Sequence, residues 1–328
     1  MSVWAIGSAF AGAFFFAFGS ALQERDAVGA PGRTLARLSL LLHLLSRPRW
    51  LIGTASVAVG VGLHLFALSH GTLTVVQPIG VSALLFAVVF AAVLKGHRVH
   101  LGDVVASVAV MLGLTGLLLA FPHVSIAPDL STTEAWVLLL SVVAVGVGGF
   151  AAAHWVHGAR RALLLAVLAG LAMGATSAFA RVLGYEATQD PASLIGWMTL
   201  APIGLAVFGG LLIQNAYRTG YFAAAYATLM VMDPVTGVGI GALVLGEPLP
   251  GDLPARVVAA VSAVVAVAGT VGLARATRGT HPDPEPASEE GGARPGAPDA
   301  TAPERGASEQ RPGSSDTNLT TFFSGDHS

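Results

Sequence analysis

The sequence contains no cysteine and few charged residues. Without Cys among its 328 residues, disulfides, thiolate metal sites and cysteine nucleophiles are excluded. Only 11% of the residues are charged, whereas a soluble domain carries about 25%. Because 54% of the residues are hydrophobic, the chain cannot present an ordinary water-exposed surface. It also has no basic domain, so we expect no binding of nucleic acid.

What fills the chain instead is a series of nine apolar stretches. A run of about 20 apolar residues predicts a membrane-spanning helix. We therefore expect an all-α integral membrane protein with nine transmembrane helices, embedded in the lipid bilayer of the cytoplasmic membrane. The predicted spans are 3–22, 50–69, 72–94, 101–121, 134–153, 162–182, 194–214, 221–245 and 254–275.

The basic residues in the loops predict the orientation. If the spans alternate in direction, twelve of the fourteen Lys and Arg residues before the far tail lie on one side of the membrane. Only Arg181 and Arg256 lie on the other side. Since cytoplasmic loops carry the excess of Lys and Arg, we expect the N-terminus outside and the C-terminus in the cytoplasm.

Two regions do not span the membrane. Leucines recur at helical spacing over residues 32–45 beside Arg33 and Arg37, which predicts an amphipathic helix on the cytoplasmic leaflet. The alternative for this region is an ordinary solvated basic loop. Residues 276–328 are rich in Pro, Gly, Ser and Glu and cannot bury enough apolar surface to fold alone, so we expect a disordered cytoplasmic tail.

An internal repeat relates the two halves of the predicted transmembrane domain, residues 1–275. Residues 71–79 (GTLTVVQPI) resemble residues 227–235 (ATLMVMDPV). Pairing the first four spans with the last four gives repeats over 3–121 and 162–275, with 134–153 as the connector. The two repeats then have opposite topology, and Pro78 and Pro234 are the matched helix interruptions. Inverted repeats with interrupted helices are typical of secondary transporters.

Asp233 is the main candidate for the functional site. It lies about halfway along its predicted span, where a charge costs several kcal/mol unless it is paired or used, and no other carboxylate is predicted as deep. Pro234 has no N–H and frees a carbonyl near residue 230, so this point could bind a cation or a proton. Gln77 is its counterpart in the first repeat, and His64 and Tyr226 are expected to line the same cavity. The alternative is a structural Asp held by a neighbouring helix.

Enzymatic and metal chemistry find little support in the sequence. No GxSxG, HExxH or P-loop pattern occurs on the predicted spans, so we expect neither an enzyme nor a cofactor. The pairs His97 and His100, and His154 and His157, have a spacing that could hold a metal, but they lack a carboxylate or Cys to complete a ligand set. We therefore predict no metal site.

Four segments of the chain carry a resemblance to a known family: residues 50–53, 64–84, 94–98 and 233–249. They resemble the drug/metabolite transporter superfamily, most closely its NIPA-type magnesium-transporter branch. The resemblance implies nine spans, transport by alternating access and a small solute or cation as cargo, with a homodimer as a further expectation. Where the family has a Gly-Glu pair, this chain has Gly62-Leu63. Of the acidic residues that the family places in its turns, this chain keeps only Glu247. The alternatives are a NIPA-type transporter of magnesium or another divalent cation, and a non-transporting scaffold that recruits partners through its basic loop and acidic tail.

Overall fold

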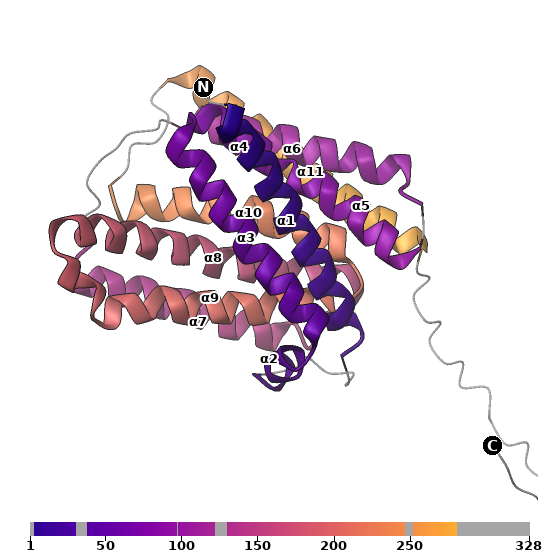
Figure 1. The fold of residues 1–328 in the computed structure, drawn as a ribbon, viewed down its shortest axis with the longest axis horizontal. Coiled ribbons are helices and arrows are strands. Elements are labelled where there is room, and N and C mark those ends of the chain that lie inside the picture. Colours follow the sequence, from indigo (N-terminus) through magenta and orange to yellow (C-terminus); the bar gives the residue numbers. More distant parts are fainter. Residues whose placement is uncertain (1–2, 31–37, 97, 122–129, 247–251, 281–328) are drawn as a thin grey trace, which may run out of the picture. The chain divides into compact units, whose positions relative to one another are not determined.

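The computed structural model describes residues 3–30, 38–96, 98–121, 130–246 and 252–280 (Figure 1). These residues belong to one compact unit and form α-helices and one short 3-10 helix, with no strand among them. The helices are α1 (Val3–Val28), α2 (Leu38–Leu45), α3 (Pro48–His70), α4 (Leu73–Val81), α5 (Ala83–Lys95), α6 (Leu101–Ala120), α7 (Thr132–Ala152), α8 (Gly158–Gln189), η1 (Pro191–Leu194), α9 (Trp197–Tyr217), α10 (Phe222–Leu243) and α11 (Leu253–Thr280).

The length and apolar character of its helices identify the chain as a multi-pass membrane protein. Nine helical segments in the described part are long and apolar enough to cross a membrane, and each corresponds to one predicted span. The outer helices expose large apolar side chains, among them Leu112 at 66%, Leu140 at 60% and Val264 at 68%. A soluble monomer rarely exposes apolar patches of such extent, whereas a bilayer covers them.

Three predicted spans differ from the helices. The first was expected to end at Leu22, but α1 continues to Val28 through Glu24 and Asp26. The sixth is a helix of 32 residues, about 48 Å long at 1.5 Å per residue, so it extends well beyond a hydrocarbon core of about 30 Å. The third consists of two helices, α4 and α5, that meet at Ser82.

The helix interruptions were predicted at the wrong positions. Pro78 lies inside α4, and the break follows four residues later at Ser82, whose hydroxyl donates to the Ile79 carbonyl at 2.6 Å. Pro234 lies inside α10, which continues through it as one helix. Proline removes one helical hydrogen bond, but in a bundle neighbouring helices can support the backbone there, so a proline need not end the helix.

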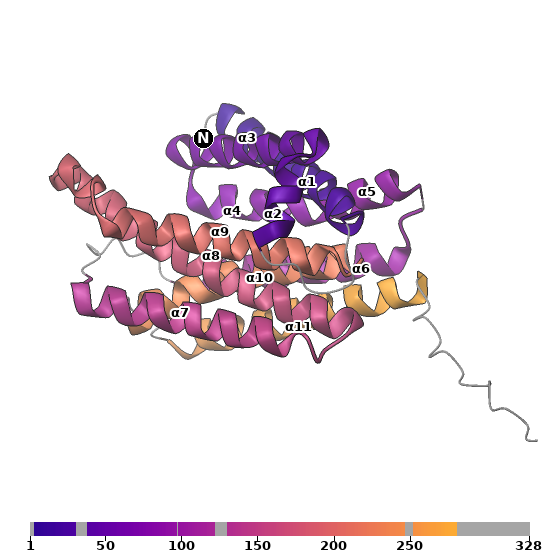
Figure 2. The same ribbon diagram turned by 90° about the horizontal axis from the view of Figure 1, so that it is seen from below.

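Helix packing relies on close backbone approach at small residues. α1 packs along α3, α6 along α11, and α8 along both α9 and α10; Figures 1 and 2 both show α1 beside α3. A Cβ added at Gly60 of α3 would lie 2.8 Å from the Gly12 carbonyl oxygen of α1. One added at Gly113 of α6 would lie 2.6 Å from the Ser262 carbonyl oxygen of α11. Small residues at these crossings allow the close contacts that hold membrane helices together.

The predicted interfacial helix is helical over its second part. α2 covers Leu38–Leu45, whereas residues 31–37 lie outside the described residues. Leu40 and Leu44 are buried against Trp50 at the start of α3, while Leu42 is 63% exposed. A solvated loop is therefore the wrong interpretation for residues 38–45.

Candidate functional site

Asp233 lies on α10 where this helix crosses α8. Gly170 and Gly174 of α8 lie directly against it, because a Cβ at Gly170 would come within 3.2 Å of the Asp233 nitrogen and one at Gly174 within 2.6 Å of its carbonyl oxygen. One turn further along α8, Ser177 is a hydrogen-bond partner of the Asp233 side chain. The three α8 residues share one face of the helix. That face brings the α8 backbone against α10 and holds the half-buried carboxylate.

Gln77 and His64 form a second polar group between α3 and α4. The His64 ring lies against Gly80, one turn after Gln77, because a Cβ at Gly80 would be 2.8 Å from His64 Cε1. Gln77 Oε1 is buried and has no hydrogen-bond partner among the described residues. The sequence predicted that these two residues line one cavity; the structure places the His64 ring of α3 against the turn of α4 that follows Gln77.

Tyr226 belongs to a different place, the junction of α1, α9 and α10. Its side chain is fully buried, and its ring centroid lies 5.6 Å from that of Phe222 and 6.2 Å from that of Phe16. Its hydroxyl faces Ser20 of α1 without reaching hydrogen-bonding geometry.

The four predicted site residues therefore form three groups in this conformation. Within the described part of the chain, no hydrogen bond, ion pair or ring contact joins Asp233 to Gln77, His64 or Tyr226. His64 lies against the turn that follows Gln77, Tyr226 packs against α1 at Phe16, and Asp233 faces α8. A single shared cavity remains a prediction.

Sequence reasoning missed a buried ion pair between Glu24 and Lys95. Lys95 Nζ lies 2.8 Å from Glu24 Oε1, and only 2% of the Glu24 side chain is exposed. The sequence placed Glu24 outside the first span, and no other carboxylate was predicted as deep in the membrane as Asp233. In the structure the protein encloses Glu24 more completely than Asp233. The sequence contained one indication of this pair, because Lys95 is the only lysine in a chain with 17 Lys and Arg residues. A lysine and an arginine are not interchangeable at a buried site.

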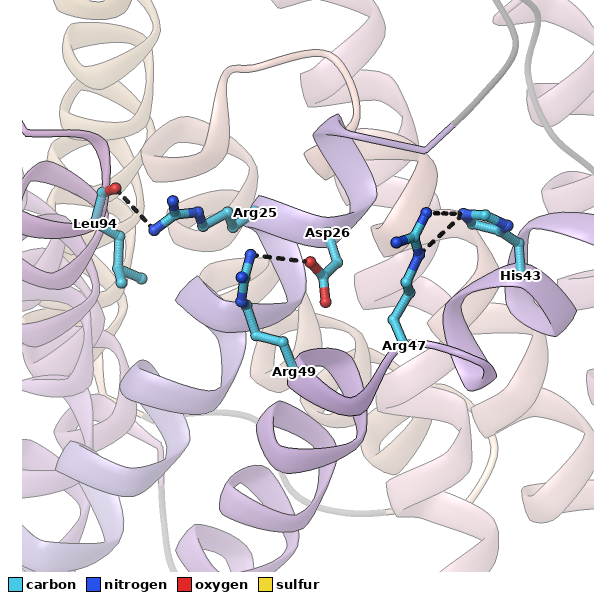
Figure 3. Close-up of polar contacts among 6 residues, drawn as sticks. All are labelled: Arg25, Asp26, His43, Arg47, Arg49 and Leu94. Carbon is cyan, nitrogen blue, oxygen red and sulfur yellow. Dashed lines mark hydrogen bonds and ion pairs between the residues drawn. The ribbon is translucent and has the colours of Figure 1, made fainter. Parts of the chain in front are cut away.

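Further polar contacts connect the helix ends around this pair (Figure 3). Arg25 of α1 donates to the Leu94 carbonyl of α5 at 3.2 Å. Arg49 of α3 lies 3.4 Å from Asp26 of α1, and Arg47 lies 3.4 Å from the ring of His43 in α2. The ends of α1 and α5 and the beginning of α3 are thus joined by side chains.

A network of amides continues from this point toward α9. Gln214 donates to Gln23 of α1 at 3.0 Å, and Gln23 donates to Thr54 of α3 at 3.1 Å. Gln214 and Asn215 are almost completely buried.

Metal-ligating residues do not gather in the described residues. No group of three or more His, Asp or Glu side chains there could hold a metal ion. His100 lies 3.9 Å from Asp103, at the beginning of α6. Its partner in the sequence pair, His97, lies outside the described residues.

Comparison with known proteins identifies one relative. The chain is 28% identical to an uncharacterized protein of Corynebacterium glutamicum over 280 residues, which cover 81% of this chain and 93% of the relative. No family model and no solved structure matches the chain. The match therefore covers most of both chains, and the name of the relative assigns no activity.

Proposed function

We propose that the protein is a secondary transporter of the drug/metabolite type that moves a small solute or cation across the cytoplasmic membrane by alternating access. In this proposal Asp233 is the coupling or binding group, and the two halves are inverted repeats. The motifs at residues 64–84 and 233–249 support membership in this superfamily.

The observation that carries the proposal is the pattern of helix packing. In the predicted correspondence α1 matches α8, and α3 matches α9. α4 together with α5 matches α10, and α6 matches α11. α1 packs on α3 as α8 packs on α9, and α1 contacts α4 and α5 as α8 contacts α10. α6 and α11, which correspond to each other, pack together. A two-fold relation between the halves would produce this pattern of the main packed pairs.

Contacts between helix ends support the alternating direction of the spans. Alternation places the end of α1 and the end of α5 on one side, and Glu24 and Lys95 join them. It places the beginnings of α7 and α9 on the other side, and there Trp136 stacks on Trp197 with ring centroids 4.5 Å apart. The excess of basic residues on the side of Glu24 makes that side the cytoplasmic one in this proposal.

The position of Asp233 suits a coupling role. It lies on α10, the third spanning helix of the second half, where α10 packs against α8, the first spanning helix of that half. At this contact Gly170 and Gly174 bring the two backbones close together with few side-chain atoms between them. Helices in such contact can slide or rock past one another. A half-buried carboxylate at the crossing can then exchange a proton or cation for cargo.

A screen for cargo tests the proposal first. We expect that one class among metal ions, amino acids, nucleosides and cationic drugs raises the thermal unfolding temperature of the purified protein. The same compound should exchange across proteoliposomes that contain the protein and not across empty ones. If no stabilising compound exchanges, while deletion of the tail from about Gly279 or of the Arg-rich loop abolishes cellular function, the scaffold alternative is correct. Residues 31–37 of that loop and residues 281–328 of the tail lie outside the described residues.

A further inference from the structure

Glu24 and Lys95 differ sharply in how the protein encloses them. Glu24 lies on α1 and only 2% of its side chain is exposed, whereas Lys95 is the last residue of α5 and its side chain is 30% exposed. α5 ends there because Gly96 takes a left-handed conformation with φ of 72°, which glycine adopts without strain. The carboxylate is therefore fixed inside the bundle, while the amine lies on a flexible stem that reaches the surface.

Tyr217 of α9 lies in the neighbourhood of this carboxylate, and two aromatic residues of α10 continue from the Tyr217 ring. Tyr217, at the end of α9, is a hydrogen-bond partner of Ser20, one turn before Glu24, and lies within electrostatic range of the Glu24 carboxylate. The Tyr217 and Phe222 ring centroids are 5.0 Å apart, and Tyr226 follows at 5.6 Å from Phe222. An ammonium ion donates hydrogen bonds to carboxylate and hydroxyl oxygens and is attracted to aromatic faces.

The chemistry of the two partners favours exchange of the cation. A carboxylate enclosed by protein needs a cation beside it, because an isolated buried charge is strongly disfavoured. The lysine ammonium is a compact charge with freely rotating donors and lacks the bidentate fork of arginine. The chain uses its only lysine here, and the neighbouring Arg25 is directed to the Leu94 carbonyl instead (Figure 3).

We propose that Glu24 is a binding site for a small alkylammonium cation, and that Lys95 fills this site as a tethered cation until a free cation displaces it. Lys95 already places an alkyl chain and an ammonium group against the carboxylate, so a free primary ammonium ion can make the same contacts. The proposal rests on the transport function proposed above, for which it names the chemical class of the cargo or coupling ion. Displacement forms no covalent bond; one ammonium group replaces another at Glu24.

The single lysine allows a direct test in the unmodified protein. Full-length protein in lipid nanodiscs, labelled with carbon-13 at the lysine ε-carbon, should give one lysine NMR signal, that of Lys95. Propylammonium chloride should move this signal saturably toward the position of an exposed lysine, whereas sodium chloride at equal ionic strength should not. In Glu24→Gln the signal should lie at the exposed position from the start and should not respond.

Two results would overturn the proposal: no saturable change beyond that with sodium chloride, or an equal change in Glu24→Gln. If Glu24→Gln does not fold, the titration of the wild-type protein decides alone. The NMR signal reports binding whether or not transport occurs. A protein that transports an uncharged solute would show uptake without the displacement, and a protein that binds the cation without transport would show displacement without uptake.

Discussion

Asp233→Asn is expected to fold and reach the membrane but to lose nearly all gradient-driven transport. The amide keeps a partner for the Ser177 hydroxyl and nearly the same volume, so the crossing of α8 and α10 should remain intact. It cannot hold a cation or release a proton, and coupling requires one of these. The measurement is uptake into proteoliposomes of the cargo found by the stabilisation screen, with and without an imposed ion gradient.

The matched control for this variant is Asp252→Asn, the same chemical change at an exposed position before α11. It should retain most of its transport. Glu247→Gln, in a predicted outer turn outside the described residues, should likewise lose much less than Asp233→Asn. Full gradient-driven transport by Asp233→Asn would reduce Asp233 to a structural residue of the α8–α10 contact.

Gly60→Leu is expected to destabilise the protein strongly. A Cβ at this position of α3 would lie 2.7 Å from the Phe16 nitrogen and 2.8 Å from the Gly12 carbonyl oxygen of α1. These are backbone atoms, so no side-chain rotation relieves the contact and the two helices must separate. Overpacking costs typically about 1–3 kcal/mol, which for a chain of this size corresponds to a drop of roughly 2–5 °C in the unfolding temperature. Thermal unfolding in detergent measures it.

Gly62→Leu provides the control for this second variant, because it lies in the same helix only two residues away. Gly62 is exposed, and no described atom outside its own helix backbone lies within 4 Å of a Cβ built there. The substitution also removes a glycine from a helix interior, which favours the helix. Its unfolding temperature should therefore equal or exceed that of the wild type. Equal losses in Gly60→Leu and Gly62→Leu would contradict the packing of α1 on α3.

The spanning helices could be predicted from sequence because each depends on a local property, a long apolar run. Side-chain pairing between distant helices has no such local signal. The first span was ended at Leu22 because Glu24, Arg25 and Asp26 interrupt the apolar run. In the structure, basic side chains from other helices pair with these carboxylates: Lys95 pairs with Glu24, and Arg49 pairs with Asp26. The helix therefore continues to Val28.

In the candidate site, too, local properties could be predicted from the sequence and contacts between helices could not. The position of Asp233 within its span followed from counting residues. That Gly170 and Gly174 pack on Asp233 itself depends on the rotation of α8 relative to α10, which apolar periodicity does not fix when a helix is apolar all round. Tyr226 and Asp233 are seven residues apart on α10, so they share a face of this helix and lie about two turns apart along it. Which helix each residue meets at its own level depends on the packing of the other helices, which the sequence of α10 does not reveal.

The central claim is that the two halves of the bundle cross the membrane in opposite directions, so that α1 and α8, their first helices, are antiparallel. The absence of native cysteine makes a single labelling experiment decisive. A cysteine replaces either Gly29, which follows α1, or Ala192, which follows α8, and intact cells are treated with an impermeant thiol reagent. The account predicts that Ala192→Cys is labelled and that Gly29→Cys is labelled only after the membrane is opened. Labelling of Gly29→Cys in intact cells, or protection of Ala192→Cys, would contradict it.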